Sequence, residues 1–142
     1  MKIFIGSDHA GYDLKEKILK KYESSFNLYD CGCHSNESVD YPDFAKEVAI
    51  CVKKNKDSFG ILICGSGIGI SIAANRFKGI RAALCSSETH AKMSRLHNNA
   101  NIIALGSRLT RETDAFKILE VFFKTPFEGN RHENRINKID KI

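Results

Sequence analysis

Five short apolar runs recur along the chain, and a glycine or a serine ends each of them. They cover residues 3–5, 28–31, 61–64, 80–85 and 102–105. Because the runs are mostly apolar rather than alternating, they are typical of strands that are buried on both faces of a parallel sheet. The pattern therefore predicts five buried, parallel strands.

Segments with helical spacing of apolar residues separate these runs. In the first, Leu14, Ile18 and Leu19 fall on one face, while lysines and glutamates cover the rest. The predicted helices cover 12–22, 41–54, 68–77, 88–96 and 110–123, and a tail helix at about 128–142 follows outside the repeat. Since strand and helix alternate five times, we predict a single α/β domain over 1–142, with helices on both faces of the sheet.

Composition narrows the class of protein. The chain has 142 residues, of which 42% are hydrophobic and 27% charged, as in one soluble globular domain. No apolar run approaches the ~20 residues of a membrane helix, and the start turns polar too early for a secretory signal. The five cysteines lack a disulfide-framework spacing, which indicates a reducing, cytoplasmic compartment.

The net charge of +5 does not indicate a nucleic-acid partner, because the basic residues do not cluster. Lys53 and Lys54 end a predicted helix, where cations complement the helix dipole. The lysines of the first helix are interspersed with glutamates, as on a solvated face. We therefore expect neither nucleic-acid nor membrane binding.

Two turns at the carboxyl edge of the predicted sheet could carry chemistry, because ligands of parallel α/β sheets bind there. The turn at 6–11 contains Asp8 and His9, although Asp8 could equally serve as a helix cap. The turn at 64–69, Cys-Gly-Ser-Gly-Ile-Gly, leads directly into a helix, so its backbone N–H groups can converge on a phosphate or an oxyanion. Ile70 breaks the dinucleotide fingerprint, and no P-loop lysine follows.

The thiol of Cys64 allows two interpretations. At the end of a buried strand it can be a small core residue, whereas the adjacent glycine-rich turn and helix dipole favour a reactive thiolate. Cys31, Cys33 and His34 resemble half of a zinc site, but no second ligand pair follows, so we predict no metal.

Basic residues in the last third of the chain could bind a phosphate group. Arg131 and Arg135 share a face if the tail is helical, and paired guanidinium groups suit a phosphate dianion. A solvated helix face is the alternative. Arg108 follows the fifth strand and is predicted at the same edge as the glycine-rich turn.

These turns belong to a longer series of segments, namely 6–11, 40–43, 64–69 with 72–75, 97–101, 105–108 and 126–129 with 131–132. In this order, and at this chain length, they resemble the type B ribose-5-phosphate isomerases, a family that includes the galactose-6-phosphate isomerase subunits. The resemblance is end to end. It implies a Rossmann-like sheet, a homodimer, and neither a metal nor a nucleotide cofactor.

The resemblance also implies residue roles. Cys64 matches the base that moves a proton between the first two sugar carbons, Ser66 matches a residue that assists proton movement between sugar oxygens, and His97 matches the ring-opening histidine. A family branch uses a glutamate six residues after the cysteine position, but Ile70 stands there, as in the cysteine branch. Asp8, opposite His97 across the sugar, matches a sugar contact, as do Tyr41 and Asn98. The enediolate would be held by the backbone amides of Gly65, Gly67, Ile68 and Gly69. The residues that match phosphate contacts are His9, Arg108, Arg131 and Arg135.

Topology makes a separate prediction about His97. It ends a predicted helix of about ten residues, which spans ~15 Å and leads away from the edge that holds Cys64. If His97 is catalytic, it must therefore serve a partner subunit. We expect a homodimer with shared active sites, or a dimer of dimers, in which the tail helix packs on the partner.

The sequence thus predicts an isomerase that interconverts D-ribose 5-phosphate and D-ribulose 5-phosphate through an enediolate. Within the family, the alternative substrate is a six-carbon sugar phosphate such as galactose 6-phosphate or allose 6-phosphate. Outside it, the alternatives are a non-catalytic phosphosugar-binding module and a thiol redox protein that uses Cys31 and Cys33. The complete catalytic set within one chain favours the pentose enzyme.

Overall fold

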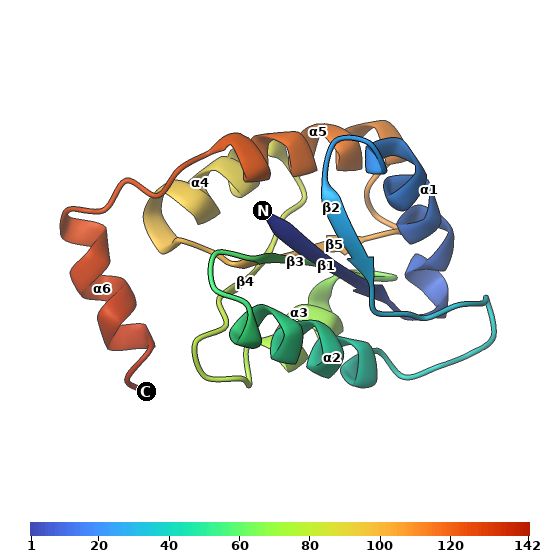
Figure 1. The fold of residues 1–142 in the computed structure, drawn as a ribbon, viewed down its shortest axis with the longest axis horizontal. Coiled ribbons are helices and arrows are strands. Elements are labelled where there is room, and N and C mark those ends of the chain that lie inside the picture. The colour runs from blue at the N-terminus through green and yellow to red at the C-terminus, as the bar shows by residue number, and fades with distance from the viewer.

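The computed structural model describes all 142 residues and contains one five-stranded sheet (Figure 1). Its strands are β1 (Lys2–Ser7), β2 (Asn27–Asp30), β3 (Phe59–Cys64), β4 (Ala82–Leu84) and β5 (Ile102–Gly106). They lie in the order β2-β1-β3-β5-β4, and every neighbouring pair is parallel. The predicted parallel sheet is confirmed.

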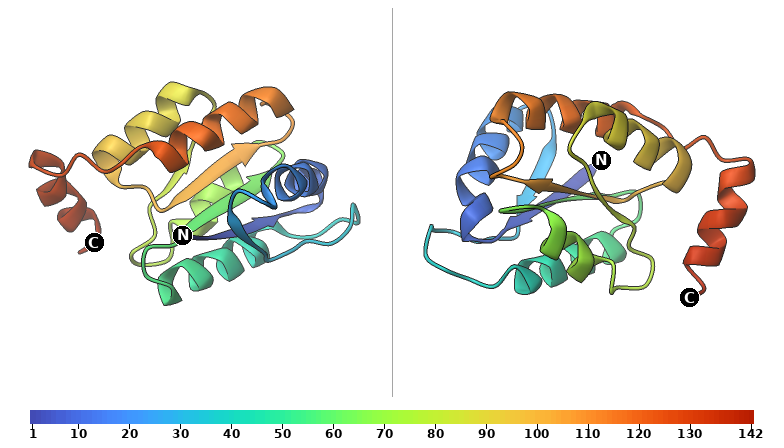
Figure 2. Two further views of the ribbon diagram at one scale, coloured as in Figure 1. Left: turned by 45° about the horizontal axis from the view of Figure 1, so that its top comes forward. Right: turned by 180° about the vertical axis from the view of Figure 1, so that it is seen from behind.

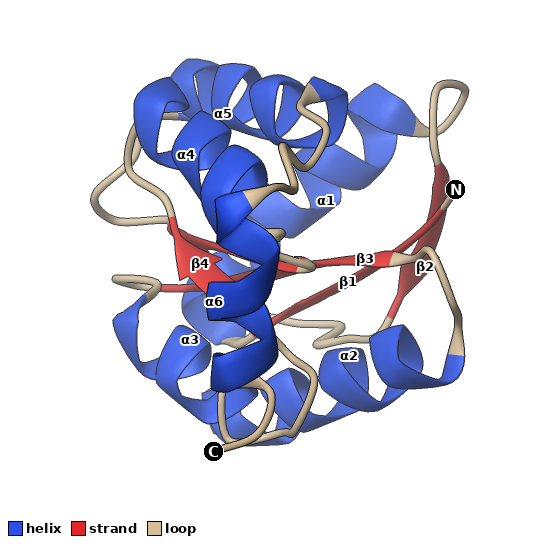
Figure 3. Ribbon diagram, turned by 90° about the vertical axis from the view of Figure 1, so that its left-hand side faces the viewer, coloured by secondary structure: helices blue, strands red, loops and turns tan.

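Helices cover both faces of this sheet, as predicted. They are α1 (Tyr12–Tyr22), α2 (Tyr41–Lys54), α3 (Ile68–Ala74), α4 (Glu88–Asn98), α5 (Glu112–Lys124) and α6 (Arg131–Ile139), and a short 3₁₀ turn, η1 (His9–Gly11), precedes α1. Figures 1 and 3 show α1, α4 and α5 on one face and α2 and α3 on the other.

The alternation of side chains along the strands builds two cores. In β3, Ile61 and Ile63 pack with the apolar faces of α1, α4 and α5. Leu62 and Cys64 point the other way and pack with residues of α2 and α3. The two-residue period of a strand thus places the thiol of Cys64 on the α3 side of the sheet, below the glycine-rich turn.

The outer strands correct one prediction. We expected all five runs to be buried on both faces, but β2 is mostly exposed, and β4 is only three residues long and partly exposed. Both are edge strands, so each has a single neighbour. The apolar run 80–85 indicates a strand, but the strand order that places it at an edge depends on contacts far along the chain.

Four helices begin or end differently from the prediction, and the fourth of the chain, α4, ends at Asn98 rather than at 96. The third ends at Ala74 rather than at 77, because the Asn75 side chain bonds the backbone N–H and C=O of Ala82 instead, at 2.8 and 2.9 Å. The fifth begins at Glu112 rather than at 110, since Thr110 N–H bonds Gly106 at the end of β5. The tail helix covers only 131–139 of the predicted 128–142.

Helix α6 stands outside the sandwich, beside α4 (Figures 1 and 2). The backbone N–H of Glu128 donates to the Leu96 carbonyl at 3.1 Å, and Arg81 forms an ion pair with Asp140 at 2.9 Å. These contacts attach both ends of the tail to the α4 side of the domain. None of the helices has the length and apolar character needed to cross a membrane.

Candidate active site

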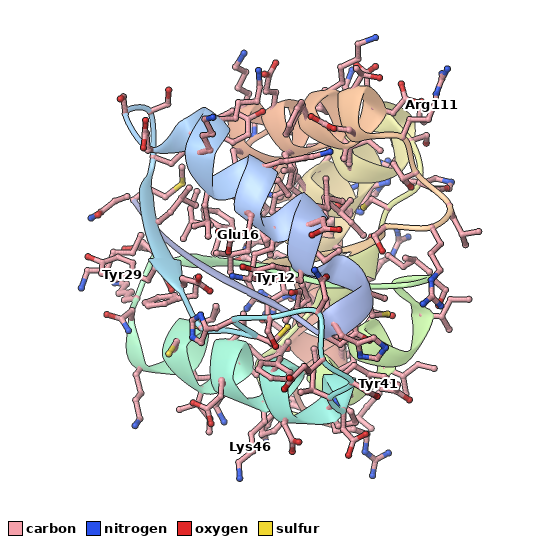
Figure 4. All side chains as sticks on the ribbon, turned by 90° about the vertical axis from the view of Figure 1, so that its right-hand side faces the viewer. Tyr12, Glu16, Tyr29, Tyr41, Lys46 and Arg111 are labelled. Atoms are coloured by element: carbon pink, nitrogen blue, oxygen red, sulfur yellow. The ribbon has the colours of Figure 1, made fainter.

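The connections of the sheet diverge between β1 and β3, because β1 leads outward to β2 while β3 leads toward β5 and β4. In parallel α/β sheets, the crevice at the carboxyl ends of two such strands is the usual ligand site. The Asp8 N–H donates to the Ile63 carbonyl at 3.1 Å and so fixes the turn after β1 against the end of β3. Figure 4 faces this edge and shows Tyr41 beside the start of α2.

A cleft of about 300 Å³ lies at this point. Its lining brings together seven of the residues singled out from the sequence, with Leu109 as an unpredicted eighth: Asp8, Tyr41, Cys64, Gly65, Ser66, Gly69, Arg108 and Leu109. Leu109 directly follows Arg108, and its 73% exposure makes it part of the rim.

The glycine-rich turn folds over the thiol. Gly67 adopts a left-handed conformation with φ of +77°, and its N–H donates to Cys64 Sγ at 3.1 Å. A Cβ at Gly67 would lie 2.5 Å from Leu84 Cδ1 and 2.9 Å from the backbone carbon of Leu105, so only glycine fits. An N–H donor on sulfur, next to the positive end of α3, stabilises a thiolate.

Ser66 lies on the open side of the same turn. Its hydroxyl accepts a hydrogen bond from the Ile68 N–H at 3.1 Å, which holds the side chain at the start of α3. The Ile68 side chain itself is half exposed and contributes only its backbone to the turn. The turn therefore presents a buried thiol and an accessible hydroxyl on one wall of the cleft.

Asp8 combines the two roles that its sequence position suggests. One carboxylate oxygen, Oδ1, accepts from the Gly11 N–H at 3.1 Å and caps the η1 turn, while the side chain also lines the cleft. Ser107, to which sequence reasoning gave no role, donates to the carbonyls of Ala10 at 2.7 Å and Cys64 at 3.2 Å. It thereby joins the turns that hold Asp8 and Cys64.

Two glycines of the turn make room for neighbouring side chains. A Cβ at Gly65 would lie 3.1 Å from Arg108 Nη1, and one at Gly69 would lie 2.6 Å from Tyr41 Cζ. The missing side chains thus allow Arg108 and Tyr41 to lie directly on the turn, where each lines the cleft.

His9 is held by a loop that sequence reasoning did not single out. Its Nδ1 lies 3.2 Å from both the backbone nitrogen and the carbonyl oxygen of Val39. This contact fixes the ring through one nitrogen and leaves Nε2 available to a ligand. Val39 carries no chemical signal, because it acts through its backbone alone.

The other predicted site residues lie elsewhere in the chain. His97 and Asn98 end α4, whereas Arg131 and Arg135 are exposed on α6, and none of the four lines the cleft. Asn101, just beyond α4, accepts from Gly60 at the start of β3, four residues before Cys64, which corresponds to roughly 13 Å along a strand. The end of α4 therefore lies at the amino edge of the sheet, as topology predicts.

His97 has a neighbour to which sequence reasoning assigned no role. The ring of His132 stacks on the His97 ring, with the ring centres 4.4 Å apart and an angle of 17° between the ring planes. Burial, and then the nearby His97 and Arg131, lower the pKa of His132, whose Nε2 is buried without a hydrogen-bond partner. Recognising this pair requires knowing that α6 docks on α4.

Glu128 completes this cluster, with its carboxylate 3.9 Å from His132 Nε2. Ligand atoms of Glu128, His97 and His132 lie within 4.8 Å of one another, which makes them the side chains best placed to bind a metal ion. The positive potential of Arg131 and Arg135, which lowers the pKa of His132, also opposes a cation there.

Two of the other thiols, those of Cys31 and Cys85, lie where burial disfavours a thiolate. Burial raises the pKa of Cys85 to about 11, and burial with the adjacent Cys51 raises the pKa of Cys31 to about 12. These thiols are therefore protonated at neutral pH. All five cysteines are free.

Comparison with known proteins reveals close relatives over nearly the whole chain. Residues 3–139 match the model of the family described as Ribose/Galactose Isomerase. Ribose-5-phosphate isomerase B of Escherichia coli is 43% identical over 142 residues, covering 99% of this chain and 95% of the relative.

Solved structures agree closely with this fold. Ribose-5-phosphate isomerase B of Clostridium thermocellum is 50% identical, with a TM-score of 0.97 over 99% of this chain and 96% of that one. The Mycoplasma genitalium enzyme, solved with bound ribulose-5-phosphate, is 47% identical, with a TM-score of 0.94 over 99% and 94% of the two chains.

Proposed function

The chain belongs to the ribose/galactose isomerase family and is a sugar-phosphate isomerase, and we propose that it interconverts D-ribose 5-phosphate and D-ribulose 5-phosphate. The observation that carries this proposal is the hydrogen bond from Gly67 N–H to Cys64 Sγ, inside a cleft that Ser66, Asp8 and Arg108 also line. Isomerisation requires a base next to hydrogen-bond donors that can stabilise a developing oxyanion.

In the proton-transfer step, the Cys64 thiolate takes the proton from C2 of the open-chain aldose, and the electron pair moves to the oxygen on C1. The resulting enediolate accepts hydrogen bonds from backbone amides of the turn such as those of Gly65 and Gly69, while the Gly67 and Ile68 amides hold Cys64 and Ser66. Loss of such a donor reduces rates by about 10²–10³-fold. The thiol returns its proton to C1, while Ser66 relays a proton between the two oxygens. The ketose forms with no net gain or loss of protons.

We further propose that ring opening uses His97 of a partner subunit in a homodimer. Within one chain, the cleft and the end of α4 lie at opposite edges of the sheet, so a second copy must supply the imidazole. Apolar side chains next to the cleft support such an interface: Ile68 and Ile72 on α3 are 50% and 61% exposed. Two such dimers can also associate into a tetramer.

The other proposed substrate contacts are likewise divided between the two chains of the dimer. His9 and Arg108 of one chain, together with Arg131 and Arg135 of the partner, bind the phosphate, and Tyr41, Asp8 and the partner's Asn98 contact the sugar. Fixing the phosphate orients C1 and C2 against Cys64, so that little orientational entropy is lost in the chemical step. No metal or nucleotide takes part in this proposal.

Isomerase rates of the wild type and of Cys64→Ala on ribose 5-phosphate test the proposed base. Cys51→Ala is the matched control, because Cys51 is a half-buried thiol within α2, outside the cleft. We expect Cys64→Ala to lose at least about 10²-fold in kcat, in line with the loss of a positioned acid–base group, and Cys51→Ala to retain activity. Equal rates in the two variants would show that Cys64 is not the base.

The family description also includes galactose, so the same assay is run on galactose 6-phosphate and allose 6-phosphate. A higher kcat/KM on a six-carbon substrate would replace the pentose assignment but retain the mechanism. Binding without turnover of any of these sugars would instead indicate a phosphosugar-binding module.

A further inference from the structure

A second cavity, of about 310 Å³, lies at the amino edge of the sheet, opposite the edge that holds Cys64. It opens between the end of α2, the start of β3 and the end of α4, and Figure 3 shows this edge with α6 in front. The residues of its wall that matter here are Lys56, Ser58, Phe59, Arg81, Arg95 and Asn99. None of them belongs to the proposed isomerase machinery.

Arg95 is a buried cation in this wall without a counter-ion. Only 7% of the residue is exposed, and no carboxylate lies within 4.0 Å of its guanidinium group. Its Nε donates to the Thr125 carbonyl at 3.3 Å, and its Nη1 to Asn99 Oδ1 at 2.8 Å and the Ala100 carbonyl at 2.6 Å. All of these acceptors are neutral, so the charge is solvated but not balanced.

The second terminal nitrogen of Arg95, Nη2, makes no hydrogen bond. Among the fully buried side-chain nitrogen and oxygen atoms, only His132 Nε2 lacks a hydrogen-bond partner. Since Nη2 of Arg95 also lacks one, it is not fully buried and retains contact with open space. Arg95 lines the cavity. Its Nη2 thus offers two N–H donors that have no partner within the protein.

Arg81 behaves differently, because Asp140 balances its charge. Its Nη1 contacts both carboxylate oxygens of Asp140 at 2.9 Å, and its Nε and Nη2 donate to the carbonyls of Asn98 and Asn99. One N–H of Nη2 remains unused. Burial, and then the charge of Arg81, lower the pKa of Arg95, whose guanidinium carbon also lies 4.8 Å from the centre of the Phe59 ring.

The rest of the wall offers two further donors and one carboxylate. Lys56 contributes an exposed ammonium group, and Asn99 contributes an amide nitrogen without a partner. The Ser58 hydroxyl already donates to the carbonyls of Asn55 and Val52. Asp57, which is exposed, is the only carboxylate in the lining. We propose that this cavity binds an oxyanion, either inorganic phosphate or the phosphate group of a monoester.

Charge and size both favour this class of ligand. A guanidinium group binds phosphate through paired N–H donors, and a cavity of about 300 Å³ is at the small end of ligand sites. An anion here would balance Arg95, and the cationic groups of the wall must outweigh the negative ends of the α2 and α4 dipoles at this edge. The proposal does not depend on the isomerase function, since it involves none of the cleft residues.

The test is a titration followed by amide chemical shifts in ¹H–¹⁵N NMR spectra, with inorganic phosphate in one series and adenosine 5′-monophosphate in the other. We expect the amides of Lys56, Ser58 and Asn101 to shift with a saturable curve of their own, separate from any shift at 65–69. Shifts with phosphate alone identify the free ion as the ligand, and shifts with the nucleotide alone identify a monoester. Shifts confined to 65–69 in both series would overturn the proposal.

Two variants of equal charge sharpen the test. Lys56→Glu places a negative charge at the cavity, whereas Lys53→Glu makes the same change on the exposed surface of α2, outside it. We expect Lys56→Glu to weaken binding at least about threefold and Lys53→Glu to leave it nearly unchanged. Equal affinities of the two variants would refute the assignment.

Discussion

A methyl group added at Gly69 would enter the space that Tyr41 occupies. Its Cβ would lie 2.6 Å from Tyr41 Cζ and 2.8 Å from the phenolic oxygen. An ordinary contact needs at least 3.4 Å, so the ring must retreat by about 0.8 Å. Tyr41 is 39% exposed and can move, whereas the backbone around Gly69 is the first turn of α3 and is held in place.

The substitution should therefore separate stability from activity. In a helix, alanine is favoured over glycine by about 0.5–1 kcal/mol, so Gly69→Ala should fold at least as stably as the wild type. If Tyr41 contacts the sugar as proposed, its displacement should lower kcat/KM by about 10- to 100-fold, since a misplacement near 1 Å can lower rates by that order.

The assay combines thermal unfolding with steady-state kinetics on ribose 5-phosphate for the wild type, Gly69→Ala, Tyr41→Ala and the double variant. In the Tyr41→Ala background there is no ring to displace, so adding Gly69→Ala should change kcat/KM by less than about twofold. The same loss in both backgrounds would show that the methyl group acts directly on the substrate or the turn. Full activity of the Gly69→Ala variant would refute the role of Tyr41 itself.

Three further variants test the supporting structure. Asp140→Asn leaves Arg81 without its counter-ion and should lower the free energy of unfolding, measured in urea, by about 1 kcal/mol. If the tail helix binds the phosphate, the same variant should raise KM more than it lowers kcat. Gly11→Ala places a Cβ 2.6 Å from the Ile63 carbonyl oxygen and should destabilise by about 1–3 kcal/mol; an unchanged midpoint would contradict this packing. Burial disfavours the charge of Lys15, but its bonds to Asp30 and Glu16 outweigh burial and raise the pKa of Lys15 above 10.5. The ion pairs therefore stabilise the fold at neutral pH, and this stabilisation is lost as the pH rises through the raised pKa. An alkaline unfolding series should show this loss in the wild type and a smaller one in Asp30→Asn.

Local signals in the sequence predicted the starts of most helices, because the residues that begin a helix lie next to it in the chain. The predicted starts at Tyr12, Tyr41, Ile68 and Glu88 agree with the structure. For α4 the cause is visible, since Ser87 accepts a hydrogen bond from the His90 N–H at 3.1 Å. Helix ends and edge strands were less predictable, because they depend on partners that are distant in sequence.

The candidate site divides in the same way. The turn at 64–69 follows from its glycine spacing, which can be read locally, and its position at the same edge as Asp8 follows because both turns come directly after parallel strands. Ser107 and the stacking of His132 on His97 could not be predicted, since each depends on the docking of separate segments. The buried, unbalanced Arg95 was likewise hidden, because its sequence neighbours give no sign that its side chain turns inward.

The parallel arrangement of the strands explains why His97 cannot reach Cys64 within one chain. Parallel strands are joined by crossovers, so α4 must start where β4 ends and return to the edge where β5 begins. Residues that end α4 therefore lie at the amino edge, whereas residues that follow β1 and β3 lie at the carboxyl edge. Reversing α4 would break the connection to β5. If His97 and Cys64 serve one reaction, a second copy of the chain must bring them together, because each is held on a rigid element at its own edge. A monomeric variant should therefore retain the cleft but lose ring-opening activity.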